Sequence, residues 1–116
     1  MKSKKWINRN FRDIYVKKAR DEGYFSRSAF KLLEIENKFH FIINSKNILE
    51  LGSSPGGWSQ VICKLNKQCK IDAFDLLKMK FIHKNINFFR QDYFKFNFKL
   101  LNKKYDLILS DIAPNT

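Results

Sequence analysis

The chain has 116 residues, a length that accommodates one domain with a small hydrophobic core. Its 23 Lys and Arg against 11 Asp and Glu give a formal net charge of +12, which indicates a polyanionic partner such as nucleic acid. The two cysteines lack zinc-site spacing, and no apolar run is long enough for a signal peptide or a membrane span. We therefore expect a soluble, cytoplasmic protein without a metal ion or a membrane partner.

The first forty residues are predicted to form a basic N-terminal helical segment. They hold eleven Lys and Arg against five acids, although an AT-rich genome would also enrich lysine. Ser26 or Ser28 can cap a helix that runs to about Phe39. The apolar residues of this stretch recur at steps of three and four residues, at Ala29, Leu32, Ile35 and Phe39. A helix and a nucleic-acid-facing arm are both compatible with residues 1–22.

Residues 41–116 alternate between strand-like and helix-like stretches. The expected strands cover 47–51, 70–75, 86–90 and 105–110, and the expected helix covers 58–66. Strands that alternate with helices predict an α/β fold with a mostly parallel sheet. The strand order 3-2-1-4 would leave the fourth strand as an apolar edge, which favours self-association.

The sequence ILELGSSPGGWSQV, Ile48–Val61, is the most informative stretch of the chain. It predicts a strand that enters a turn with three glycines and then a helix, and such a turn lets the backbone approach a ligand closely. The spacing matches neither the dinucleotide fingerprint nor the P-loop, so the pattern favours a ligand without phosphates. An S-adenosylmethionine (SAM) site fits this pattern, and a glycine-rich turn without a ligand is the alternative.

Three aspartates follow predicted strands. Asp75, Asp92 and Asp111 each come just after a strand, and the carboxyl ends of parallel strands meet at one edge of a sheet. One such aspartate is usually a turn former or a helix cap. Three of them indicate a ligand site beside the glycine-rich turn.

Five segments of the chain resemble the FtsJ family of RNA 2′-O-ribose methyltransferases in order and spacing. They are YFSRSAFKLLEIENKF (24–39), ILELGSSPGGWSQV (48–61), FDLLKM (74–79), RQDYF (90–94) and YDLILSDIAPNT (105–116). The resemblance implies a Rossmann-like SAM-dependent methyltransferase fold, of which residues 41–116 form the N-terminal half, truncated after the fourth strand. It also implies transfer of a methyl group to a uridine ribose 2′-hydroxyl of large-subunit ribosomal RNA, with that RNA or the large ribosomal subunit as partner.

The family's cofactor contacts correspond to residues that the patterns above single out. The resemblance implies SAM contacts at Gly56, Trp58, Asp75, Asp92 and Asp111. Asp75 would accept hydrogen bonds from the ribose hydroxyls, Asp92 would bind the adenine amino group, and Trp58 would wall the pocket.

The family's catalytic residues form a Lys-Asp-Lys-Glu set. Lys31 matches the first lysine and Asp111 the aspartate, so the resemblance implies that Lys31 orients the target ribose and that Asp111 lies near the transferred methyl group. The second lysine and the glutamate come later in the family than Thr116. An RNA-binding remnant without catalysis is therefore the second interpretation, and a fragment of a nucleotide-binding oxidoreductase is a third, weaker one.

Overall fold

The computed structural model describes Lys17 and residues 21–110. The predicted arm at the N-terminus lies almost entirely outside the described residues, and so does Asp111. The described elements, in chain order, are α2 (Ser28–Phe39), β1 (Asn47–Leu51), α3 (Gly57–Leu65), β2 (Lys70–Phe74), β3 (Ile86–Phe89), η1 (Phe98–Leu101) and β4 (Leu107–Ser110). All strands and both α-helices agree with the predicted positions to within two residues at each end, whereas the short helix η1 was not predicted.

The four strands form one parallel sheet in the order β3-β2-β1-β4. This confirms the predicted α/β class and strand order. Asn47 pairs with Lys70, and Ile48 pairs with Leu107, so the strands begin at nearly the same level. The sheet therefore has an amino edge, where all strands begin, and a carboxyl edge, where they end.

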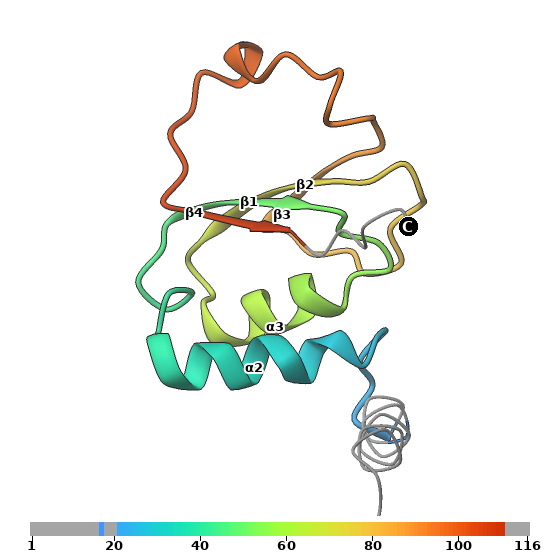
Figure 1. Cartoon of the computed structure of the whole chain (residues 1–116), viewed down its shortest axis with the longest axis vertical. Helices are drawn as coiled ribbons and strands as arrows, with labels where there is room; N and C mark the ends of the chain where they lie inside the picture. The colour runs from blue at the N-terminus through green and yellow to red at the C-terminus, as the bar shows by residue number, and fades with distance from the viewer. Residues whose placement is uncertain (1–16, 18–20, 111–116) are drawn as a thin grey trace, which may run out of the picture.

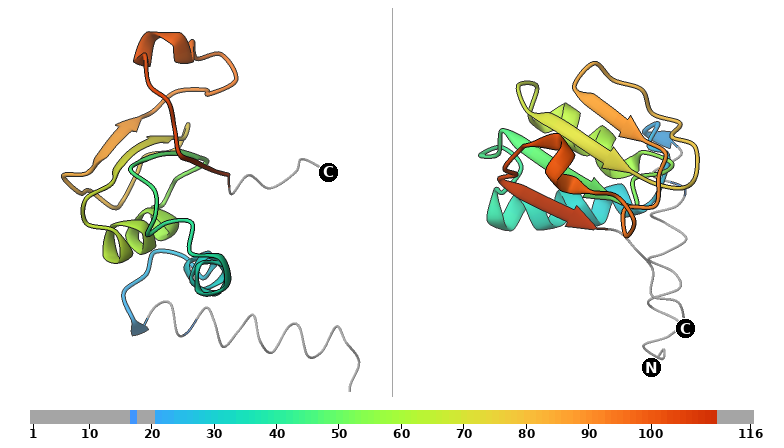
Figure 2. Two further views of the ribbon diagram at one scale, coloured as in Figure 1. Left: turned by 90° about the vertical axis from the view of Figure 1, so that its left-hand side faces the viewer. Right: turned by 90° about the horizontal axis from the view of Figure 1, so that it is seen from above.

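Helices α2 and α3 cover one face of the sheet, and the connection from β3 to β4 arches over the other (Figure 1; Figure 2 shows the layers from two further directions). The helix face contains the hydrophobic core, in which Leu32 of α2 and Ile62 of α3 meet Ile48 and Ile71 of the strands. Alternate residues of each strand point to the opposite face. There Phe74 stacks on Phe89, with ring centroids 4.6 Å apart.

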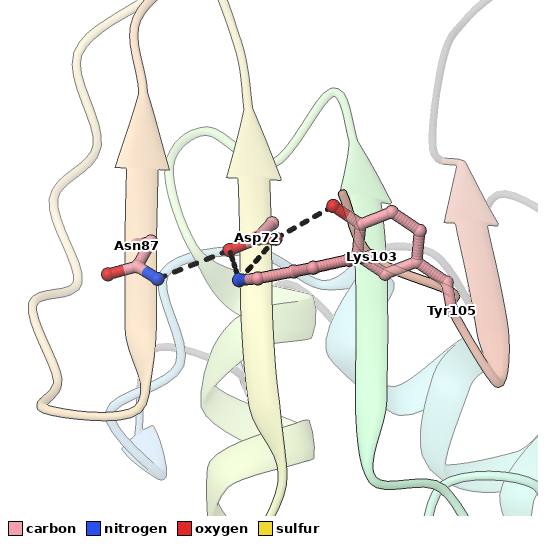
Figure 3. Close-up of polar contacts among 4 residues, drawn as sticks. All are labelled: Asp72, Asn87, Lys103 and Tyr105. Atoms are coloured by element: carbon pink, nitrogen blue, oxygen red, sulfur yellow. Dashed lines mark hydrogen bonds and ion pairs between the residues drawn. The ribbon is translucent and has the colours of Figure 1, made fainter. Parts of the chain in front are cut away.

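A buried carboxylate fastens the β3–β4 connection to the sheet. Asp72 of β2 is 2% exposed and accepts a hydrogen bond from the Tyr105 hydroxyl over 2.7 Å. Its carboxylate also pairs with Lys103 Nζ at 3.0 Å and accepts a bond from Asn87 Nδ2 at 3.2 Å (Figure 3). A buried carboxylate without partners would destabilise the fold. Lys103 and Tyr105 supply partners for Asp72, and both belong to the connection, so these contacts hold it over the second face.

The two cysteines are part of the protein interior. Cys63 and Cys69 are buried free thiols, and burial raises the pKa of Cys63 to about 12. A thiol with so high a pKa is unreactive at neutral pH. Among the described residues there is no cluster of metal-binding side chains, and none of the described helices is long and apolar enough to cross a bilayer.

Candidate functional site

The glycine loop, residues 52–56, connects β1 to α3 at the carboxyl edge. Gly52 and Gly56 have φ angles of 77° and 122°, which side-chain-bearing residues rarely adopt. The backbone N–H groups of Gly52 and Ser53 both donate to the Phe74 carbonyl oxygen, at 2.8 and 3.1 Å. The loop therefore bends toward the end of the neighbouring strand β2.

The residues after β2 hold the loop from its other side. Asp75 Oδ2 accepts a hydrogen bond from Ser54 N over 2.8 Å. The Pro55 carbonyl oxygen accepts two more, from the backbone N–H groups of Lys80 and Phe81. The structure thus places Asp75 directly beside the glycine loop, at the edge where the sequence pattern located it.

A cavity of about 60 Å³ lies inside the loop. Its lining includes Glu50, Ser53, Ser54 and Trp58. The Ser53 hydroxyl is buried and has no hydrogen-bond partner among the described residues, whereas Glu50 Oε2 accepts a bond from Ser59. Because buried polar groups are normally paired, the Ser53 hydroxyl marks a place for a polar group of a ligand or for an ordered water.

The N-terminal end of α2 joins this site. Trp58 Nε1 donates to the Ser28 carbonyl oxygen over 2.9 Å. A Cβ on Gly57 would lie 2.1 Å from Ser26 Oγ, so the glycine permits close packing of the two helix starts. Lys31 follows Ser28 by one helical turn and is exposed. These contacts fix the helix that carries Lys31 to the helix that follows the glycine loop.

Asp92 lies on the same edge, in the segment after β3. Its Oδ1 accepts a bond from Phe94 N at 3.0 Å, which is the turn-forming role that such an aspartate often has. Desolvation raises the pKa of Tyr93, and the carboxylates of Asp75 and Asp92 raise it further. The backbone N–H of Asp75 donates to the Phe89 carbonyl oxygen over 3.3 Å, so the end of β3 lies beside the end of β2.

The structure thus brings most of the predicted site residues to one edge. Gly56 is part of the glycine loop, Trp58 and Asp75 lie beside it, and Asp92 follows β3 at the same edge. Lys31 has no described contact with the site, although its helix α2 is hydrogen-bonded to Trp58. Asp111 lies outside the described residues. It follows Ser110, which is opposite Leu51 in the sheet.

Several residues of the site were missed by sequence reasoning. The serines at 26, 28, 53 and 54 line the cavity or pack against its walls. The sequence SSP between the glycines was a usable signal for two of them, because polar side chains inside a tight loop often serve the loop or its ligand. Ser26 and Ser28 were predicted as helix caps, and this prediction was wrong, because the N-cap residue of α2 is Arg27 and no described side chain caps the helix. Their place beside the cavity depends on how α2 packs.

The comparison with known proteins agrees with this architecture. Residues 24–116 match the model of the family described as FtsJ-like methyltransferase. The ribosomal RNA large subunit methyltransferase E of Anaplasma phagocytophilum is 42% identical over 98% of this chain and 49% of its own length, and that of Rickettsia felis is 42% identical over 98% and 55%. The chain thus spans about half the length of these curated relatives.

A solved structure shares the fold. A ribosomal RNA methyltransferase from Plasmodium falciparum superposes with a TM-score of 0.67 at 36% identity, covering 80% of this chain and 58% of that one. The family model covers most of the chain, and it includes the glycine loop and both strand-end aspartates that the structure places at the carboxyl edge. On this evidence the chain belongs to the FtsJ-like methyltransferase family.

Proposed function

We propose that the carboxyl edge binds SAM and that the chain acts in methylation of a uridine ribose 2′-hydroxyl in large-subunit ribosomal RNA. The observation that carries the proposal is the hydrogen bond between Ser54 N and Asp75 Oδ2, because it joins the loop after β1 to the acid after β2. Open α/β sheets bind nucleosides between these two positions. The names of the relatives, which are ribosomal RNA methyltransferases, support the choice of substrate.

Asp75 has acceptor capacity left for a ribose. Its two oxygens accept bonds from Ser54 N and Leu77 N, at 2.8 and 2.9 Å. An ionised carboxylate offers about four lone-pair positions, so two ribose hydroxyls can still donate to it. We assign the adenine amino group to Asp92, whose Oδ1 is used by Phe94 N and whose second oxygen can accept another bond.

The cavity in the glycine loop fits the polar end of the same ligand. At about 60 Å³ it is too small for a nucleoside, and it is lined by the Ser53 hydroxyl and the Glu50 carboxylate. These groups suit the ammonium and carboxylate of an amino acid, because one donates and the other carries negative charge. We therefore assign the methionine end of SAM to this cavity, with the adenosine toward Asp75.

The chemistry then requires little beyond positioning. SAM supplies a methyl group on a positively charged sulfur, which needs no further activation. The 2′-oxygen of the ribose would form the new bond to the methyl carbon as the bond to sulfur breaks. S-adenosylhomocysteine would then leave as a neutral thioether, and the hydroxyl proton would pass to solvent water. We assign Lys31 to orientation of the ribose, because Trp58 fixes its helix to the cofactor loop, and Asp111 to the reacting centre.

The direct test is transfer of labelled methyl from SAM to undermethylated large ribosomal subunits. The proposal predicts transfer that is lost in Asp111→Ala and reduced in Lys31→Ala, while Glu34→Gln, an exposed change on α2, leaves the rate unchanged. If a folded sample binds SAM and transfers no methyl, this chain is not sufficient for catalysis. A salt-sensitive affinity for RNA without SAM binding would favour the RNA-binding remnant instead.

A further inference from the structure

Every strand of the sheet begins at or shortly after a lysine. Lys46 precedes β1, Lys70 is the first residue of β2, Lys84 precedes β3, and Lys104 precedes β4. All four side chains are exposed. We call these four residues the lysine row. Since the strands are parallel and in register, the row lies along the amino edge, opposite the glycine loop.

The backbone hydrogen bonds of the edge hold the row together. Lys70 N donates to the Lys46 carbonyl oxygen over 2.8 Å, and Asn85, next to Lys84, accepts from Ile71 N over 2.8 Å. Neighbouring strands lie about 4.8 Å apart, so four strands spread the row over roughly 14 Å. The backbone at Lys46 and Lys70, and beside Lys84, is therefore hydrogen-bonded along the amino edge, and Asp106 N, two residues after Lys104, donates to the Asn47 carbonyl oxygen over 2.8 Å.

The positive charge of the row is largely uncompensated. None of its four lysines forms an ion pair with a described carboxylate, whereas the adjacent Lys103 is paired with Asp72. Asp106 lies two residues after Lys104, and its Oδ2 already accepts bonds from Lys46 N and Asn47 N. Those backbone bonds, and to a smaller extent the positive charge of Lys46, lower the pKa of Asp106. Asp106 thus offsets part of the charge of Lys46, and it is one negative charge beside four positive ones.

The surface around the row is hollowed and polar. One cavity of about 470 Å³ is lined by both Lys46 and Lys70 together with Asn44 and Gln68. A second, of about 500 Å³, is lined by Lys104, Lys99 and Asn102. Lysine ammonium groups with amide side chains between them match the phosphate and sugar groups of a nucleic-acid backbone.

We propose that the lysine row is a second RNA-binding surface, which holds the phosphate backbone of the substrate RNA at a distance from the reacting nucleotide. The row lies at the opposite end of strands of four or five residues, so the two edges are roughly 15 Å apart. An RNA that binds both the carboxyl edge and the lysine row therefore contacts the protein at both edges of the sheet. The identity of that RNA rests on the proposed function, whereas the binding surface itself does not.

The test measures the affinity for a labelled RNA hairpin from the large ribosomal subunit, without SAM, between about 50 and 200 mM salt. The variant Lys46→Gln/Lys70→Gln/Lys104→Gln is compared with a control of equal charge, Lys64→Gln/Lys78→Gln/Lys95→Gln, whose lysines lie elsewhere. All six side chains are exposed, so both variants should fold. The arginine version of the row variant keeps the charge and should bind as the unchanged protein does.

We expect the row variant to lose roughly tenfold or more in affinity, and its salt slope to fall by about 2 to 3, because three phosphate contacts are removed. The control variant should lose much less. Equal losses in both variants would overturn the proposal, because net charge alone would then explain binding. Binding to vesicles of anionic phospholipid that depends on the row, without RNA binding, would also overturn it.

The experiment separates this inference from the proposed function. Asp75→Asn should leave the RNA affinity and its salt slope unchanged while it weakens SAM binding. If the row variant keeps full RNA affinity while SAM binding is normal, only the lysine-row proposal fails. If SAM does not bind but the row variant loses RNA affinity, only the cofactor assignment fails.

Discussion

Trp58 Nε1 donates a hydrogen bond to the Ser28 carbonyl oxygen over 2.9 Å, which links the first turn of α3 to the first turn of α2. Trp58→Phe removes the bond and keeps much of the packing, so we expect the free energy of unfolding to fall by about 1 kcal/mol. Urea denaturation measures this change. Phe25→Leu, at a side chain that is 44% exposed, is the control and should change little.

The same link predicts an effect on activity. If Trp58 positions the helix of Lys31, Trp58→Phe should lower the rate of methyl transfer more than it lowers the affinity for SAM. Single-turnover rates and equilibrium SAM binding distinguish the two effects. A loss of SAM affinity with an unchanged single-turnover rate would show that the indole serves the cofactor and not the helix.

A substitution in the glycine loop, at Gly56, can be compared with one outside the loop, at Gly23. Gly56 and Gly23 both have positive φ angles, 122° and 80°, but a Cβ at Gly56 would lie 2.5 Å from Phe81 Cβ, whereas a Cβ at Gly23 meets nothing within 4 Å. Gly23→Ala should cost about 1 to 2 kcal/mol of backbone strain. Gly56→Ala should cost more and also weaken SAM binding. Equal costs in denaturation would mean that the loop can move away from Phe81.

The buried cluster of Asp72 predicts a dependence on alkaline pH. Desolvation and the hydrogen bond to Asp72 raise the pKa of Tyr105 above its ordinary value of about 10. The folded state therefore favours the protonated hydroxyl. This contribution to stability is complete below the unfolded pKa and is lost as the pH rises through the folded one. Tyr105→Phe should remove this part of the alkaline decline, as thermal unfolding at several pH values would show.

The exposed edge of the sheet predicts self-association. β4 pairs with β1 on one side and with no described strand on the other, and Ile108 on this strand is 60% exposed. Such an edge can pair with a second chain. Light scattering should show a concentration-dependent dimer that Ile108→Lys weakens. A monomer at every concentration would contradict this prediction.

Much of the fold could be predicted from sequence because two different signals agreed, the spacing of apolar residues and the position of the glycines. Apolar spacing located α2, and the glycines between β1 and α3 located the turn at the carboxyl edge. The connection over the second face was harder to predict, since η1 is short and has no repeating pattern. The role of Asp72 was also missed, because an aspartate inside the strand sequence KIDAF becomes a buried anchor only once Lys103 and Tyr105 fold over it.

Some residues of the candidate site could also be located from the sequence, whereas others could not. Asp75 and Asp92 were found because parallel strands bring their carboxyl ends together, a consequence of topology that sequence order reveals. Ser28 and Ser53 were not found, since their contacts arise from helix packing and from burial within a loop. Sequence therefore located the edge and its acids, whereas the inner lining of the site required three-dimensional packing.

Calorimetric titration of the folded chain with SAM tests the central claim most directly. The comparison uses Asp75→Asn and Asp92→Asn in the site and Glu34→Gln as an exposed control on α2. Asp75→Asn retains an oxygen that can accept the Ser54 N–H and loses only the bond from the exposed Leu77 N–H, so its effect on folding should be small. The account predicts one site per chain, an affinity reduced about tenfold or more by each aspartate change and unaffected by the control. No binding by the folded, unchanged chain, or binding that all three variants retain, would contradict it.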